Sequence, residues 1–334
     1  MKLLIVGGTG FLSSALVERG LVNGHEVTIL TRGRRPVNSP QPVRQLVADR
    51  NDREAFGAVL AGQTFDAVID AICYTPEDAR QDVEAFSGRV GRLIMISTDF
   101  VYAVDSRSLP VTEDTPRDAP SEYGQNKIAA EDVFFAASDR LPCTILRPPH
   151  VVGSGGLLGT GSLQGRDPAL LARLRRGEPI VLIEGGTYLI QPVDRLDIAD
   201  ACLAVLDKPA TIGRAYTIAG PQVITTRTYY EIIADEIGVS LKVLSMARDA
   251  YLAAYPERAS FTVHRIYDMC ALARDAGFWP SIPLRESLRE MIAWLEKNPP
   301  PGADAPPTGK EKQILALLSE RDTQLREILK KCLT

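Results

Sequence analysis

Residues 2–13 read KLLIVGGTGFLS, an apolar run followed directly by a glycine-rich turn. The apolar run predicts a buried parallel strand, and the amphipathic stretch after the turn predicts a helix. Gly7 permits a tight turn, and Gly10 lets the backbone approach a pyrophosphate lying on the helix N-terminus. Ser13 stands where such turns often carry a third glycine, and it is small enough to pack helix against strand. This stretch therefore predicts a dinucleotide-binding unit.

Strand-like and helix-like patterns alternate beyond this turn. Further apolar strands are expected at 26–30, 44–47, 67–71, 93–97 and 144–147, with helices at 12–21, 53–60, 76–86 and 125–137. Such alternation predicts an α/β protein with a doubly wound parallel sheet, a Rossmann fold. Ligands bind such sheets outside the carboxyl ends of the strands, where the glycine turn also falls.

The pattern changes after Gly153, and a second, smaller unit is expected. We predict a dinucleotide-binding domain at 1–153 completed by about 191–220, a discontinuous C-terminal substrate lobe at 154–190 and 221–297, a proline-rich linker at 298–309 and a helical tail at 310–334. Gly153–Gly165 is expected to form a mobile loop over the site. A spacing of four and three residues, interrupted by Arg321, relates Ile314, Leu318, Leu325, Ile328 and Cys332. The tail is thus either docked on its own domain, partly frayed, or a self-associating or partner helix.

Composition and charge favour a soluble, cytoplasmic protein. The 334 residues are 45% hydrophobic and carry a net charge of −4, which suggests neither a nucleic-acid nor a membrane partner. The five cysteines are widely spaced and are expected to be reduced and mostly buried. His25, His150 and His264 are isolated, and no carboxylate cluster has ligand spacing, so no metal site is expected.

A second signature, Tyr123-Gly124-Gln125-Asn126-Lys127, points to proton transfer. Tyr123 and Lys127 are four residues apart, so a helix places them on one face. An ammonium group near a phenol favours the phenolate, which predicts a lowered pKa for Tyr123. Such a tyrosine gives a proton to a ketone oxygen, or takes one in the reverse direction. Thr98, at a strand end, is expected to hold the same oxygen.

With these motifs, residues 1 to about 297 resemble an extended short-chain dehydrogenase/reductase of the NAD-dependent epimerase/dehydratase family. Besides the glycine turn and Tyr123–Lys127, the segments at 97–102 and 147–153 carry the resemblance. It implies Tyr123 as the catalytic acid/base, Lys127 as its partner, Thr98 as the third member, and a homodimer. The residues expected to bind the cofactor are Gly7, Thr9, Gly10, Phe11, Leu12, Ala71, Tyr123, Lys127 and Pro149.

The sequence departs from the family's sugar 4,6-dehydratases after Thr98. Those dehydratases carry a glutamate where this chain has Phe100, beside Asp99. Without that glutamate the elimination step lacks its base, so a 4,6-dehydratase is not expected. Asp99, Phe100 and His150 are the candidates to bind substrate, although for His150 a packed or solvated histidine is the favoured interpretation.

The choice of cofactor depends on the end of the second strand. NAD-binding folds usually place an acid there for the ribose 2′-hydroxyl. Here the acid is missing, and Arg32, Arg34 and Arg35 follow instead. Arginine binds a 2′-phosphate through charge-assisted hydrogen bonds, which favours NADP, with NAD as second choice. A solvated basic loop is the alternative. For Asp49 the family resemblance implies a contact with the adenine ring, and a helix cap is the alternative.

The motifs together predict an NADP(H)-dependent oxidoreductase that acts on a small molecule. It would reduce a ketone, or oxidise the alcohol, on a nucleotide sugar or a secondary metabolite, with Tyr123 as acid/base. A nucleotide-sugar epimerase with tightly bound NAD(P)⁺ uses the same three residues and stays open. A non-catalytic dinucleotide-sensing or RNA-binding protein is the alternative from another class, although such relatives typically lose the tyrosine or the lysine.

Overall fold

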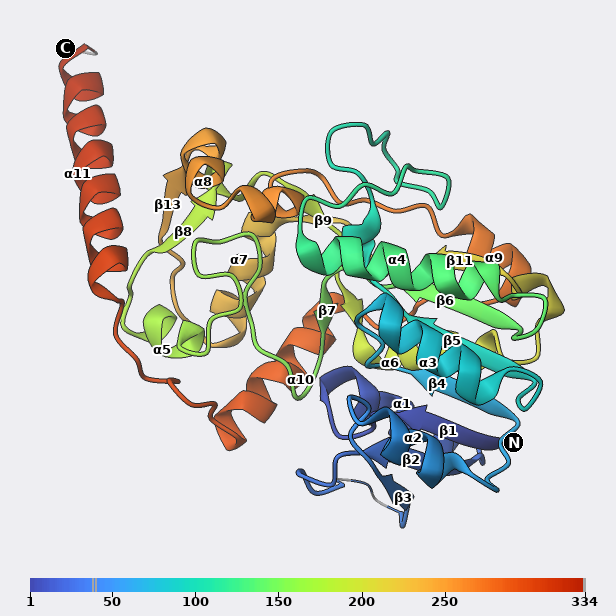
Figure 1. Ribbon diagram of the computed structural model, residues 1–334. Helices are drawn as coiled ribbons and strands as arrows, with labels where there is room; N and C mark the ends of the chain where they lie inside the picture. The colour runs from blue at the N-terminus through green and yellow to red at the C-terminus, as the bar shows by residue number, and fades with distance from the viewer. Residues whose placement is uncertain (38, 40, 333–334) are drawn as a thin grey trace.

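A seven-stranded parallel sheet forms the centre of the computed structural model, which describes residues 1–37, 39 and 41–332 (Figure 1). Its strand order is β11-β6-β5-β4-β1-β2-β3, so the order reverses between β1 and β4. The strands are β1 (Lys2–Val6), β2 (Glu26–Thr31), β3 (Arg44–Val47), β4 (Ala67–Asp70), β5 (Arg92–Ile96), β6 (Cys143–Arg147) and β11 (Arg214–Thr217). The predicted α/β fold is confirmed, and the reversal is where such sheets bind ligands.

Helices cover both faces of this sheet because alternate strand residues point to opposite sides. Leu3 and Ile5 join the core formed with α1 (Phe11–Val22) and α6 (Arg195–Ala204). Leu4 and Val6 join the core formed with α2 (Arg53–Leu60), α3 (Pro76–Phe86) and α4 (Glu122–Ala136). The sheet is therefore doubly wound, with a hydrophobic core on each face.

A separate hydrophobic core lies among the later elements. It is built by α5 (Leu170–Arg175), β8 (Ile180–Ile183), α7 (Thr226–Glu236) and α10 (Leu284–Lys297), and β13 (Val243–Met246) pairs in parallel with β8. Short pairs join β7 (Val151–Val152) to β10 (Val193–Asp194) and β9 (Leu189–Ile190) to β12 (Ile224–Thr225). The helix α8 (Arg248–Ala254) follows β13 in the chain, whereas α9 (Cys270–Ala276) packs Leu272 and Ala276 into the core of the seven-stranded sheet. The predicted domain boundaries stay a prediction.

The tail forms one helix, α11 (Gly309–Cys332), which runs along the edge of the molecule away from the seven-stranded sheet (Figure 1). Its first half docks: Leu318 is buried in a small cluster beside β8 and β13, and Arg321 donates a 2.8 Å hydrogen bond to the Ser245 carbonyl. Leu325 and Ile328, farther along, are exposed. Positions 333 and 334 of the predicted tail lie outside the described residues. No helix of the described residues combines the length and apolarity needed to cross a bilayer.

Gly8 illustrates how tightly the glycine turn packs on the sheet. Its φ is +115°, and a β-carbon added there would lie 2.6 Å from a methyl carbon of Ile29. We expect Gly8→Ala to lower the free energy of unfolding by about 2–4 kcal/mol, because backbone strain and overpacking add. Gly62→Ala is the matched control: its φ is +72° but open space surrounds it, so strain alone should cost about 1 kcal/mol. If urea denaturation gave the same loss of unfolding free energy for Gly8→Ala and Gly62→Ala, the packing argument would be contradicted.

Candidate active site

The N-terminus of α1 forms the floor of the site. Gly10 is its N-cap residue and, having no side chain, contributes no capping acceptor to the first turn. The Gly10 N–H itself donates to the Ser13 hydroxyl at 2.9 Å. Backbone N–H groups and the positive end of the helix dipole therefore face the space above the turn, which suits an anion such as a pyrophosphate.

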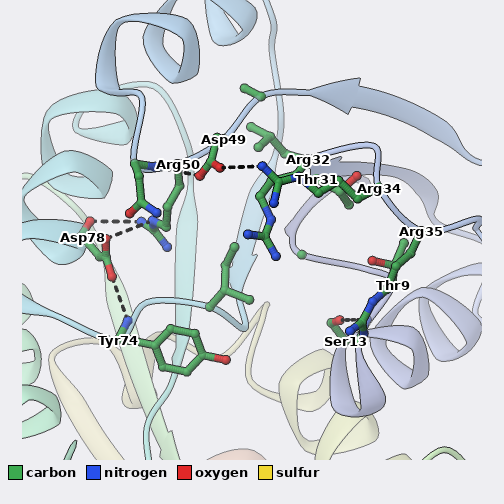
Figure 2. Close-up of a pocket in the computed structure, with 16 residues that line it drawn as sticks. Thr9, Ser13, Thr31, Arg32, Arg34, Arg35, Asp49, Arg50, Tyr74 and Asp78 are labelled. Atoms are coloured by element: carbon green, nitrogen blue, oxygen red, sulfur yellow. Dashed lines mark hydrogen bonds and ion pairs between the residues drawn. The ribbon is translucent and has the colours of Figure 1, made fainter. Parts of the chain in front are cut away.

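A first cleft of about 580 Å³ opens between this turn and the ends of β2, β3 and β4 (Figure 2). It is lined by Gly7, Thr9, Gly10, Ser13, Leu30, Thr31, Arg32, Arg34, Arg35, Ala48, Asp49, Arg50, Asn51, Ile72, Tyr74 and Asp78. The three predicted arginines and Asp49 thus lie in one cleft with the glycine turn. Arg34 and Asp49 form a loose ion pair at 3.9 Å.

Asp49 does not cap a helix, so that alternative is wrong. The N-cap of α2 is Asp52, whose carboxylate accepts a 3.0 Å hydrogen bond from the Ala55 N–H. Asp49 instead accepts from the Asn51 N–H at 3.1 Å and lines the cleft. The cap lies three residues later because α2 begins at Arg53.

A second cleft, of about 310 Å³, adjoins the first and contains the predicted catalytic residues. It is lined by Gly10, Phe11, Leu12, Ser13, Ala71, Ile72, Tyr74, Ile96, Ser97, Thr98, Tyr123, Lys127, Pro148, Pro149 and Val151. Gly10, Ser13, Ile72 and Tyr74 line both clefts. The two clefts together therefore offer one elongated space across the sheet's reversal point, which fits a dinucleotide.

The predicted catalytic residues come together from the end of β5 and from α4. Thr98 follows β5, and Ser121 caps α4 by accepting a 3.2 Å hydrogen bond from the Gly124 N–H. This cap starts the helix at Glu122, so Tyr123 lies in the first turn and Lys127 in the next. The Lys127 Nζ lies 5.9 Å from the centroid of the Tyr123 ring.

The expected lowering of the Tyr123 pKa is not observed, and this corrects the sequence-based prediction. Burial and the neighbouring Tyr74 and Asp99 raise the pKa of Tyr123 to about 12, although a hydrogen bond with Thr98 opposes the shift. The Lys127 ammonium lies near the Tyr123 ring but donates to the carbonyl oxygens of Cys73 and Ile96. Tyr123 is thus a protonated phenol at neutral pH, suited to donating a proton.

The three predicted substrate residues differ in their surroundings. Phe100 packs edge-on to Tyr123, with ring centroids 6.5 Å apart. Asp99 is 2% exposed, and its carboxylate accepts a 2.5 Å hydrogen bond from the Tyr267 hydroxyl. His150 is 7% exposed and packs edge-on to Tyr229, and burial holds its pKa well below the usual range. Of these three, only Phe100 therefore packs its ring against Tyr123, while Asp99 and His150 are buried.

Sequence reasoning missed a buried ion-pair network centred on Arg50, which we term the Arg50 cluster: Arg50, Asp70, Asp78 and Asp82. The guanidinium lies 2.6 Å from Asp70, 3.3 Å from Asp78 and 2.7 Å from Asp82. Asp70, Cys73 and Asp82 also bring three potential metal-ligand atoms within 4.8 Å of one another. Because Arg50 already binds both carboxylates, we interpret the group as an ion-pair network. These residues are spread over 33 positions of the sequence, and their spacing does not predict that they contact one another.

Glu131 was missed as well, although its position offered a signal. It follows Lys127 by four residues on α4, so it extends the same helix face. Its carboxylate accepts hydrogen bonds from Ser97 at 2.5 Å and from Arg147 at 2.6 Å. Ser97 precedes Thr98 and Arg147 precedes the prolines of the second cleft. Glu131 therefore links α4 to the ends of β5 and β6, which lead to Thr98 and to the prolines of the second cleft.

Known proteins show what this arrangement resembles. Residues 3–219 match the model of the NAD dependent epimerase/dehydratase family. The 2′-dehydrokanamycin reductase of Streptomyces kanamyceticus is 26% identical over 301 residues, covering 88% of this chain and 84% of the relative. UDP-arabinose 4-epimerase 1 of Arabidopsis thaliana is 26% identical over 294 residues, covering 74% and 70%. The solved structure of the Bordetella bronchiseptica enzyme WbmG in complex with NAD superposes with a TM-score of 0.72 at 18% identity, covering 89% and 94%.

Proposed function

This chain belongs to the NAD dependent epimerase/dehydratase family, and we propose that within it the protein is an NADP(H)-dependent reductase of a ketone on a nucleotide sugar or secondary metabolite. The family and the relatives establish an enzyme that uses a nicotinamide dinucleotide. The observation that carries the finer proposal is the cleft at the end of β2, where an acid is replaced by Arg32, Arg34 and Arg35. The relative named 2′-dehydrokanamycin reductase supports a ketone of secondary metabolism as substrate.

The side chains of the second cleft supply proton transfer and orientation. A bound nicotinamide dinucleotide supplies the hydride. The Thr98 hydroxyl donates a hydrogen bond to the ketone oxygen, and the Tyr123 phenol gives that oxygen its proton. The Lys127 ammonium stabilises the phenolate left behind. Because burial raises the pKa of Tyr123 to about 12, the phenol starts protonated at neutral pH, as reduction requires.

The arginine assignment yields a direct binding prediction. We expect Arg32→Ala to raise the Kd for NADPH roughly tenfold to hundredfold and to leave the Kd for NADH nearly unchanged, because a charge-assisted bond to the 2′-phosphate is lost. Arg44→Ala is the matched control: Arg44 is an exposed arginine on β3 that bonds Gln63 outside both clefts. Titrating nucleotide fluorescence against each variant measures both constants. Parallel loss of NADPH and NADH affinity would instead indicate damage to the fold of the cleft.

Turnover tests the reaction itself. NADPH oxidation is followed against a panel of keto-sugars that includes 2′-dehydrokanamycin and nucleotide-linked ketoses, and the product alcohol is identified by mass spectrometry. One NADPH consumed for each alcohol formed supports the reductase. Binding of NADPH with no oxidation by any ketone, together with isomerisation of a sugar, would replace the reductase with an epimerase.

An epimerase is the second candidate because a relative of this chain is named UDP-arabinose 4-epimerase 1. Epimerisation oxidises and re-reduces one carbon with the same bound nucleotide, and it needs the same Thr98, Tyr123 and Lys127. The two candidates differ in whether the nucleotide leaves after each turnover, so retention of the nucleotide by the purified protein distinguishes them.

A further inference from the structure

The Lys127 ammonium group is almost completely enclosed. Lys127 is 1% exposed, and its Nζ donates to the Cys73 carbonyl at 2.6 Å and to the Ile96 carbonyl at 2.8 Å. These two bonds use two of its three N–H donors. Burying a cation is costly unless surrounding groups stabilise its charge, so the remaining wall of this enclosure matters.

Tyr74 forms that wall. Its ring centroid lies 5.0 Å from the Lys127 Nζ, closer than the ring of Tyr123 at 5.9 Å. The same residue lines both clefts, and its side chain reaches into the first cleft (Figure 2). Tyr74 is 50% exposed, which is unusual for a large aromatic side chain in contact with a buried cation. One edge of the ring therefore faces the clefts while its face lies against the ammonium.

The backbone around Tyr74 is fixed by the Arg50 cluster. The Asp78 carboxylate accepts hydrogen bonds from the Tyr74 N–H at 3.0 Å and the Thr75 N–H at 3.1 Å. The Asp70 carboxylate accepts from the Ile72 N–H at 2.6 Å. Arg50 holds both carboxylates. The backbone that supplies Tyr74 and the Cys73 carbonyl is thus anchored from beneath, and it cannot shift without breaking these hydrogen bonds.

We propose that Tyr74 is a positioning residue for Lys127: its ring face and the carbonyls of Cys73 and Ile96 form a socket that fixes the ammonium where the two clefts join. The inference rests on the proposed function only in taking Lys127 as the partner of Tyr123. A cation over an aromatic face is attracted by the ring quadrupole, and the attraction grows when water is excluded. The hydroxyl of Tyr74 takes no part in this socket.

Other charged and titratable groups also act on Lys127. Burial lowers its pKa, while Cys73, Asp70, Glu131 and Asp78 favour its charged form. All of them stay in place when only the side chain of residue 74 changes. A change in Lys127 titration between variants at position 74 therefore reports on the ring.

The test compares Tyr74→Leu, which removes the ring, with Tyr74→Phe, which keeps it. The titration of the Lys127 side chain is followed by NMR in the cofactor-free protein, with the resonance assigned by its loss in Lys127→Met. We expect Tyr74→Leu to raise the acid dissociation constant of Lys127 about threefold to tenfold and Tyr74→Phe to leave it within about twofold.

Cofactor affinity provides the second readout. Tyr74→Leu should weaken NADPH binding by roughly threefold to thirtyfold and Tyr74→Phe should weaken it less, with thermal melting confirming that both variants fold. The proposal would be overturned if Lys127 had the same acid dissociation constant in Tyr74→Leu as in the wild type. It would also be overturned if Tyr74→Phe changed that constant as much as Tyr74→Leu does. Neither result bears on the proposed reductase activity, because NADPH binding and turnover of the wild-type protein test that activity separately.

Discussion

Tyr123→Phe is expected to lower kcat for ketone reduction by about 10²–10⁴-fold, because the variant loses the only proton that we assign to the ketone oxygen. The aromatic ring remains, so the shape of the second cleft and the edge contact with Phe100 are kept. NADPH affinity should therefore change by less than about threefold. Steady-state turnover and fluorescence titration of NADPH measure the two quantities on the same preparation.

A matched control removes a phenolic hydroxyl elsewhere. Tyr255 packs against Tyr251 and is not among the residues lining either cleft, so Tyr255→Phe should keep wild-type turnover and affinity. If Tyr123→Phe also turned over normally, Tyr123 would not be the proton donor. A large loss of NADPH affinity in Tyr123→Phe would show that the hydroxyl serves binding rather than catalysis.

Arg50→Met should lower the free energy of unfolding by about 3–5 kcal/mol, since it leaves three buried carboxyl groups without their cation. Although burial opposes it, Arg50 keeps the pKa of Asp70 below its ordinary value. Burial and the neighbouring Asp70 raise the pKa of Asp82 well above its ordinary value. Chemical denaturation monitored by far-UV circular dichroism measures the loss. Arg53→Met, at an exposed arginine that bonds the Glu77 carbonyl, is the matched control and should cost less than about 1 kcal/mol.

The loss of unfolding free energy in Arg50→Met should also depend on pH. Without the guanidinium, the folded-state pKa of Asp70 rises above its unfolded value, and the pKa of Asp82, which burial already raises, rises further. Protonation then stabilises the folded protein, so stability is retained at low pH and is lost as pH rises through those raised values. We expect a smaller difference from wild type at pH 5 than at pH 8. A deficit that grew on acidification would contradict the ion-pair account.

The sheet and the clefts were predictable because their signals are local. The central strands β1, β4 and β5 are short apolar runs, and the glycine turn fixes where the first strand meets its helix. The ends of such strands meet along one edge, which is why the turn, Thr98 and the arginines after β2 assemble as expected. The spacing of Tyr123 and Lys127 likewise placed both residues in one cleft.

The features that the sequence did not predict depend on how far a side chain is buried and on contacts between residues far apart in the sequence. Helix spacing brings Lys127 near Tyr123, but it does not reveal that partial burial and the neighbouring Tyr74 raise the pKa of Tyr123. The Arg50 cluster joins residues from three segments whose charges look like ordinary surface residues in the sequence. Helices α7 to α10 were not resolved individually from the pattern, because the later segments lack a strong strand–helix alternation.

The most direct test of the reductase assignment is the identity and retention of the nucleotide. The purified protein is denatured, any released nucleotide is identified by mass spectrometry, and cofactor-free protein is titrated with NADPH and NADH. A reductase that exchanges its cofactor each turnover predicts little retained nucleotide and NADPH binding at least about tenfold tighter than NADH, as expected for one extra charge-assisted contact. Stoichiometric NAD⁺ that resists dialysis would contradict both the NADP(H) preference and the reductase, and would identify an epimerase.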